Sequence, residues 1–321
     1  MKLSVLTVLY SAIPLEETLK KLSAMGVQSV ELGCGGYPGD AHLKPSEYLD
    51  KPEKIEQLKA LVAKYNIDIC ALACHANPVH PDKAIAKDQD SQLRAAIKLA
   101  GQMGIDTVIT FSGCPGDCES SMYPNWVTCS WPPDYAKILE YQWNDVLIPY
   151  WKDTAAYAKA NGVTKIALEM HPGFCVYNTS TMLKLREAVG GVIGANLDPS
   201  HLFWQGMNPV ESIKALRGAI YHFHAKDTKI DSANVALNGV LDTSSYGDLT
   251  DRSWSFRTVG YGHGLDVWNE IISTLKTVGY DGPISIEHED PLMSVDEGLS
   301  KAVSLLKQSI IFEQPGEMWW A

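Results

Sequence analysis

The chain alternates strand-like and helix-like segments eight times, which restricts the fold more than any other feature of its sequence. Apolar, β-favouring segments occupy residues 3–9, 27–33, 67–74, 105–111, 167–173, 195–201, 221–227 and 284–290. Amphipathic helical segments follow near residues 14–25, 52–65, 88–103, 140–161, 179–189, 208–217, 265–277 and 294–311. Eight such units in one chain predict an α/β fold, a single (β/α)8 TIM barrel that spans residues 1–321.

Glycines stand where several of the helical segments end. They are Gly26, Gly104, Gly162 and Gly279, each just before the next strand. We expect left-handed backbone at these positions, because that conformation ends a helix and turns the chain. An open, doubly wound sheet is the alternative architecture. However, the first strand is not followed by G-x-G-x-x-G, so a dinucleotide site has no support.

The last four strand segments each carry a candidate metal ligand near their end. The ligands are Glu169, Asp198, His224 and Glu287. Strand ends of a barrel meet at one mouth, so these side chains should lie together. Carboxylates with one imidazole suit Mn²⁺, Mg²⁺, Co²⁺ or Zn²⁺, and we take one Mn²⁺ per chain as the first choice. His222 and Glu289 compete for two of these positions, because each shares a face with the preferred residue.

Two connections between strands and helices are unusually long. They cover residues 112–139 after the fourth strand and residues 228–262 after the seventh. Loops of this length are usually functional, so we expect them to form walls or lids over the mouth. Their tryptophans, and Trp204, suit the apolar face of a sugar or an aromatic aglycone, or else they pack the loops.

Composition disfavours some classes of partner. The formal net charge of −11 argues against nucleic acid, which needs a basic face. No apolar stretch reaches 18 residues, so we expect no membrane span. The seven cysteines are an odd number in a chain too large to need disulfides, which favours reduced thiols and a cytoplasmic protein.

The ligand-bearing motifs resemble those of the xylose-isomerase-like barrel family of sugar isomerases and epimerases. The resemblance covers essentially the whole chain and implies that Glu169, Asp198, His224 and Glu287 hold a single divalent cation. It also implies that His201 and Arg257 contact substrate oxygens. The segment GYGHG (260–264) is similar to the family's Gly-rich turn, with His263 where a Glu is more usual.

A narrower resemblance concerns the barrel (alpha) subunits of C-glycoside deglycosidases, which act on 3-keto-glycosides made by partner oxidoreductases. It rests on the strings FSGCPGD (111–117), PNWV (124–127), EMHPGF (169–174), NLDPSH (196–201), HAKDT (224–228) and MWWA (318–321).

The expected chemistry is removal of a proton beside the carbonyl of a sugar or keto-sugar. Glu169 and Glu287 are the candidate acid and base pair, and His171 is a competing base. Return of the proton on the other face gives isomerisation or epimerisation, whereas a leaving group β to the carbanion gives elimination, as in a lyase or deglycosidase. The candidate substrate-binding residues are His75, His201, Lys226, Arg257 and His263. Few basic residues occur in the predicted loops, which favours an unphosphorylated sugar or glycoside.

A scaffold subunit and a DNA-repair nuclease are the two alternatives to this hypothesis. The terminal PGEMWWA favours an interface, either with a second subunit or in a homo-oligomer, so the chain could be a metal-stabilised scaffold for a sugar oxidoreductase. The related DNA-repair (AP) endonuclease barrels hold three zinc ions with more histidines. Here the fourth strand ends Phe-Ser-Gly (111–113) without a histidine, which disfavours a nuclease.

Overall fold

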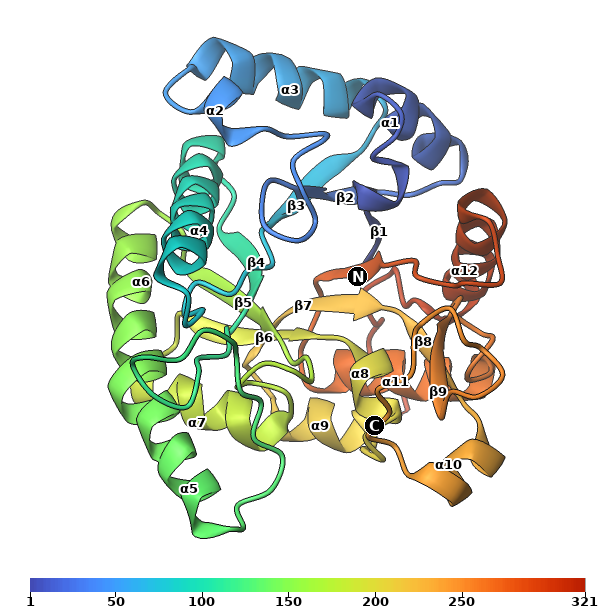
Figure 1. Cartoon of the computed structure of the whole chain (residues 1–321). Coiled ribbons are helices and arrows are strands. Elements are labelled where there is room, and N and C mark those ends of the chain that lie inside the picture. The colour runs from blue at the N-terminus through green and yellow to red at the C-terminus, as the bar shows by residue number, and fades with distance from the viewer. Residues whose placement is uncertain (321) are drawn as a thin grey trace.

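Eight parallel strands close into a barrel in a computed structural model that describes residues 1–320 (Figure 1). Around the barrel each strand pairs with the next in the chain, and β10 pairs back onto β1. The barrel strands are β1 (Lys2–Leu6), β2 (Ser29–Gly33), β3 (Asp68–Ala73), β4 (Thr107–Phe111), β5 (Lys165–Glu169), β6 (Ile193–Leu197), β7 (Ile220–Ala225) and β10 (Pro283–Ile286). The predicted (β/α)8 barrel is confirmed, and closure excludes the open sheet.

The main helices lie outside the ring of strands, as in Figure 1. They are α1 (Leu15–Ala24), α3 (Pro52–Lys64), α4 (Lys83–Met103), α6 (Ile148–Ala160), α7 (Thr179–Val189), α9 (Pro209–Ala215), α11 (Leu265–Thr277) and α12 (Val295–Ser309). The four expected glycine turns are confirmed: Gly26, Gly104, Gly162 and Gly279 have φ of 74°, 73°, 82° and 88°. Short helices that the sequence pattern did not reveal are η1 (Thr7–Tyr10), α2 (Pro45–Tyr48) and α8 (Pro199–Phe203).

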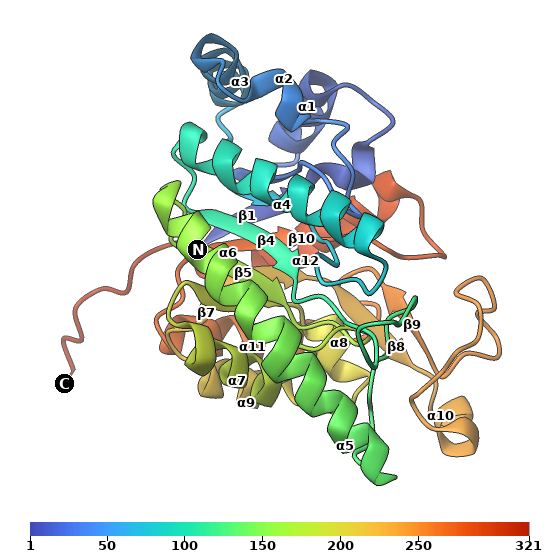
Figure 2. The same cartoon turned by 60° about the vertical axis from the view of Figure 1, so that its left-hand side comes forward.

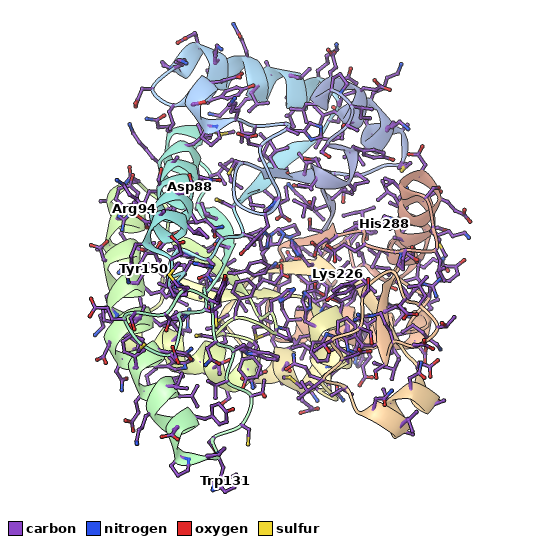
Figure 3. The ribbon with its side chains drawn as sticks, viewed as in Figure 1. Asp88, Arg94, Trp131, Tyr150, Lys226 and His288 are labelled. Carbon is purple, nitrogen blue, oxygen red and sulfur yellow. The ribbon has the colours of Figure 1, made fainter. Side chains whose placement is uncertain are left out.

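The helical segment that contains α6 begins at Pro133, earlier than the position near residue 140 that periodicity indicates. A π-helix, η2 (Tyr141–Leu147), joins α6 to α5 (Pro133–Glu140), and the three segments run as one rod along the outside of the barrel (Figure 2). The irregular part of the connection after β4 therefore ends near residue 132. Trp131 lies at its outer edge, 74% exposed and far from Lys226 in Figure 3.

The connection after β7 is folded, although we expected an irregular loop. It contains β8 (Asp227–Ile230), α10 (Ser232–Asn238) and β9 (Trp254–Arg257), and β8 and β9 form an antiparallel pair. Helix α10 projects from the body in Figure 2. Trp204 and Trp254 stack on each other with ring centroids 4.5 Å apart and are buried, so both help to pack the connection after β7 against the barrel.

The core consists of the apolar layer between strands and helices, where Trp151 and Trp268 are the largest fully buried side chains. Inside the barrel the lining becomes polar towards the strand ends, with Glu31, Glu169, His222 and His224 all buried. No helix within residues 1–320 is long and apolar enough to cross a membrane.

Candidate metal centre and active site

Three carboxylates and one imidazole converge where β5, β6, β7 and β10 end. Ligand atoms of Glu169, Asp198, His224 and Glu287 all lie within 4.8 Å of one another. Glu169 ends β5 and His224 lies in β7, whereas Asp198 and Glu287 directly follow their strands. Strand six ends at Leu197 because Asp198 caps α8, accepting a hydrogen bond from the Ser200 amide at 2.8 Å.

Glu31 fixes how His224 faces this cluster. Its Oε2 atom lies 2.9 Å from His224 Nε2, deep in the barrel. A carboxylate only accepts, so Nε2 must carry the proton and the lone pair of Nδ1 is directed at the cluster. Nδ1 lies 3.1 Å from Glu169 and 3.2 Å from Glu287.

The cluster fits a hard divalent cation. His224 Nδ1 and Asp198 Oδ2 are both buried and have no hydrogen-bond partner. Such atoms are costly to leave unpaired, and a cation would satisfy them. Three carboxylate oxygens with one imidazole nitrogen are a donor set typical of Mn²⁺, Mg²⁺ or Zn²⁺. Carboxylate ligands also outnumber the histidine, unlike the histidine-rich sets of multi-zinc sites.

Burial and crowding of charge set the protonation of the ligands. Burial, together with the neighbouring charges of Glu169 and Glu287, raises the pKa of Asp198 to about 7. Burial also opposes ionisation of Glu287, but the ammonium of Lys226 and the adjacent His224 ring together outweigh it and lower the pKa of Glu287 to about 2. Lys226 Nζ lies 2.8 Å from Glu287 and 3.3 Å from Asp198, so a fixed positive charge faces the carboxylates.

Glu169 accepts hydrogen bonds on both of its carboxylate oxygens. His75 Nε2 lies 3.0 Å from Oε2 of Glu169, and His201 Nε2 lies 3.1 Å from Oε1. Burial resists the ionised form, but the hydrogen bond from His201, the adjacent His224 ring and the hydrogen bond from His75 together hold the pKa of Glu169 well below its usual value. Burial lowers the pKa of His201 to about 3, so this imidazole is neutral and donates. Both carboxylate oxygens of Glu169 are therefore fixed.

His171 lies against the cluster with one nitrogen free. Its ring centroid is 4.0 Å from that of His201, and its Nδ1 donates to the carbonyl of Pro172. The lone pair on Nε2 is therefore available as a base, and burial lowers the pKa of His171, which keeps the ring neutral. Phe111 packs against the ring edge, with centroids 5.0 Å apart.

The remaining two predicted substrate residues are held by other partners. Arg257 Nε donates to both carboxylate oxygens of Asp290 at 3.1 Å. His263 Nδ1 lies 2.8 Å from Asp227 and its ring stacks on Phe203. Asp227 also accepts from the amides of the Gly-rich turn 260–263. The structure thus brings His75, His201 and Lys226 to the ligands, but ties Arg257 and His263 into the surrounding loops.

Sequence reasoning missed Glu31, Glu289 as a partner of Lys226, and the cavity beside His171. Glu31 stands inside an apolar strand, SVELG, and this buried acidic residue was the signal that could have marked it. Its Oε2 lies 3.1 Å from both His222 and Ser285, so His222, the alternative ligand, faces Glu31. Figure 3 shows Lys226 within the ring of strands and His288 nearer α12.

Comparison with known proteins is consistent with this architecture. Residues 19–309 match the family model described as "Xylose isomerase-like TIM barrel". The "Uncharacterized protein YfiH" of Bacillus subtilis (strain 168) is 40% identical over 312 residues, covering 97% of this chain and 99% of that protein. The probable 3-DHS dehydratase AsbF of Bacillus anthracis superposes with a TM-score of 0.65 at 19% identity, over 96% of this chain and 99% of that one. A D-tagatose 3-epimerase-like protein gives a TM-score of 0.62 at 21% identity, over 96% and 98%.

Proposed function

This chain belongs to the xylose isomerase-like TIM barrel family, and from that premise we propose that it is a divalent-metal-dependent enzyme that removes a proton beside the carbonyl of a keto-sugar. The observation that carries the proposal is the cluster of Glu169, Asp198, His224 and Glu287 beside the free nitrogen of His171. Relatives of the same fold include an epimerase-like protein and a probable dehydratase, which support isomerisation and elimination respectively.

Each side chain of the site has its own role in the proposed reaction. Glu169, Asp198, His224 and Glu287 would hold the cation, for which Mn²⁺ is our first choice. A cation held there supplies positive charge that stabilises the negative charge developing on the carbonyl oxygen. His75 and His201 keep Glu169 ionised and in place, and Lys226 does the same for Glu287. Cationic Lys226 can also donate to substrate hydroxyls.

His171 is the favoured base in this proposal. Both oxygens of Glu169 are occupied by hydrogen bonds, whereas Nε2 of His171 is not. A base that faces one side of the substrate, with a leaving group β to the carbanion, gives elimination, as in cleavage of a 3-keto-glycoside. Return of the proton by Glu287 from the opposite side would instead give epimerisation.

Deuterium incorporation tests the proton chemistry. In deuterated water the Mn²⁺-loaded protein should place deuterium at the carbon beside the carbonyl, in product or in recovered substrate. A primary isotope effect with substrate deuterated at that carbon is the companion measurement, because a buried base can return the same proton. Absence of exchange, isotope effect and product across ketoses and 3-keto-glycosides, with metal bound, would refute the proposal.

His171→Ala separates the two reaction types. In the elimination mechanism this variant should lose at least about 100-fold in turnover while it retains the metal, because general-base catalysis contributes about 10²- to 10⁴-fold. His80→Ala, at a histidine outside the cluster, is the matched control. Substantial residual activity of His171→Ala would favour the two-carboxylate epimerase, and loss of metal would instead make His171 a ligand.

The C-terminal segment supports a second candidate function, that of a metal-stabilised scaffold for a sugar oxidoreductase. Trp319 and Trp320 are 88% and 69% exposed on a C-terminal segment that extends away from the body (Figure 2). Ala321, the last residue of the MWWA string, lies outside the described residues. Exposed aromatic pairs of this kind favour an interface, with a partner oxidoreductase or a second copy. Size-exclusion chromatography with and without residues 316–321 tests this, and an unchanged elution volume would contradict a homo-oligomer held by the tail.

A further inference from the structure

A cavity adjoins the candidate metal cluster on the side of His171. It has a volume of about 550 Å³ and is lined by residues that include His171, Tyr246, Phe256, Glu289 and Met293. It connects with the cluster through Glu289, whose carboxylate lies 3.2 Å from Lys226 Nζ. Ligand pockets commonly have volumes of about 300–1,000 Å³, so this one has room for more than the reacting sugar ring.

One wall of the cavity is an aromatic surface, and a buried arginine contacts it on the side away from the cavity. Tyr246 is 59% exposed, and its ring lies nearly parallel to that of Phe256, with centroids 6.1 Å apart and 18° between planes. Arg252, which is buried, places its guanidinium 4.2 Å from the Tyr246 ring centroid and 4.7 Å from that of Trp254. Its Nε donates to the Trp254 carbonyl at 3.0 Å. Tyr246 is thus exposed yet held in place, so a ring that stacks on it loses little side-chain entropy.

The charges around the cavity disfavour an anion. Among the described cationic residues near it, Lys226 is engaged by Asp198, Glu287 and Glu289, and Arg257 by Asp290. Arg252 is buried behind Tyr246 and donates to the backbone carbonyls of Trp254 and Ser244, so its charge is covered by the ring. Burial lowers the pKa of His288 and keeps it neutral. The carboxylate of Glu289 is half exposed at this wall, so a phosphate or carboxylate on the ligand would meet negative charge there.

We propose that Tyr246 and Phe256, with Met293, form a subsite for an uncharged aromatic group attached to the reacting sugar, the aglycone of an aryl glycoside. The subsite rests on the proposed function, because it places the sugar at the cluster and the aromatic ring beside His171. It makes Tyr246 the residue that determines specificity for the group beyond the sugar.

Paired glycosides test the subsite on the Mn²⁺-loaded full chain. Binding of phenyl and methyl 3-keto-β-D-glucosides is measured by calorimetry, and their turnover is measured in parallel. The native chain should bind the phenyl glycoside at least about tenfold more tightly, and Tyr246→Ala should reduce this phenyl-to-methyl ratio about tenfold, the equivalent of about 1.4 kcal/mol. Tyr246→Phe, which keeps the ring, should preserve the ratio. Tyr135→Ala, at an exposed tyrosine on α5, is the control and should match the native chain.

The outcomes separate the subsite from the reaction. An unchanged ratio in Tyr246→Ala, in a variant with native thermal stability, overturns the subsite even if both glycosides are converted. A phenyl preference that depends on Tyr246, without turnover of either glycoside, supports the subsite and refutes elimination from 3-keto-glycosides. If neither glycoside binds, the subsite is wrong, and the deuterium-exchange test across ketoses decides the proposed function.

Discussion

Replacing Glu31 by Gln should weaken metal binding although Glu31 would not touch the metal. Glu31 is fully buried, and its Oε2 accepts hydrogen bonds from His222, His224 and Ser285 at 3.1, 2.9 and 3.1 Å. Only the bond from His224 fixes a ligand, because it keeps the proton on Nε2 and leaves Nδ1 free. A Gln amide can donate to Nε2, which would move the proton to Nδ1 and block the ligand atom.

The expected loss follows from that single bond. A hydrogen bond to a charged partner is worth about 1.5–3 kcal/mol, and loss of such a partner of a ligating histidine typically costs about 10- to 100-fold in metal affinity. We therefore expect the Kd for Mn²⁺ to rise about 10- to 100-fold, the equivalent of about 1.4–2.7 kcal/mol. Calorimetric titration of the metal-free protein measures it, and imidazole ¹⁵N shifts report the tautomer of His224.

Two variants control for general disturbance of the core. Ser285→Ala removes one bond to Glu31 but keeps the bond from His224, so its Kd should stay within about twofold of the native value. His222→Gln alters the other imidazole, which does not face the cluster, and should likewise retain most of the affinity. The reasoning fails if Glu31→Gln binds Mn²⁺ as tightly as the native chain, or if Ser285→Ala loses as much affinity.

Three further predictions follow from the cluster and the packing. Elemental analysis should find about one divalent metal per chain, and Asp198→Ala should lower occupancy and activity together; three zinc ions, or full occupancy in the variant, would contradict the site. A metal ligand must be deprotonated, and the pKa of Asp198 is raised to about 7, so the affinity for Mn²⁺ should rise between pH 6 and 8. Calorimetry in buffers of different ionisation enthalpy should detect the released proton. A flat pH profile would show that Asp198 is already ionised. Gly101→Ala should lower the melting temperature by several degrees, because an added Cβ would lie 1.7 Å from the Asn161 carbonyl oxygen. Gly191→Ala should have little effect, because its Cβ would meet only the Arg186 side chain, at 3.8 Å.

The fold, and the meeting of the four candidate ligands at one mouth, were predictable from the sequence because their signals are local. Periodicity changes between 2 and 3.6 residues mark each strand and helix, and glycines mark the helix ends. Glu169, Asp198, His224 and Glu287 stand at or just beyond strand ends, and strand ends of a barrel share one mouth. Local signals were less accurate for boundaries: strand six ends at Leu197 because Pro199 favours the start of a helix.

Other parts of the site depend on contacts between residues far apart in the chain. Glu31 meets His222, His224 and Ser285 across 191, 193 and 254 residues, and no local pattern encodes such a pairing. The partner of Arg257 is likewise not encoded locally, because Asp290 lies 33 residues further along the chain and accepts its hydrogen bond. Trp254 packs on Trp204, which leaves Tyr246 as the exposed ring. Spacing and residue type in the sequence determined which chemical groups line the mouth. Tertiary packing decided which of them are free to act, because a side chain is available only when no neighbour already satisfies its hydrogen bonds, charge or apolar surface.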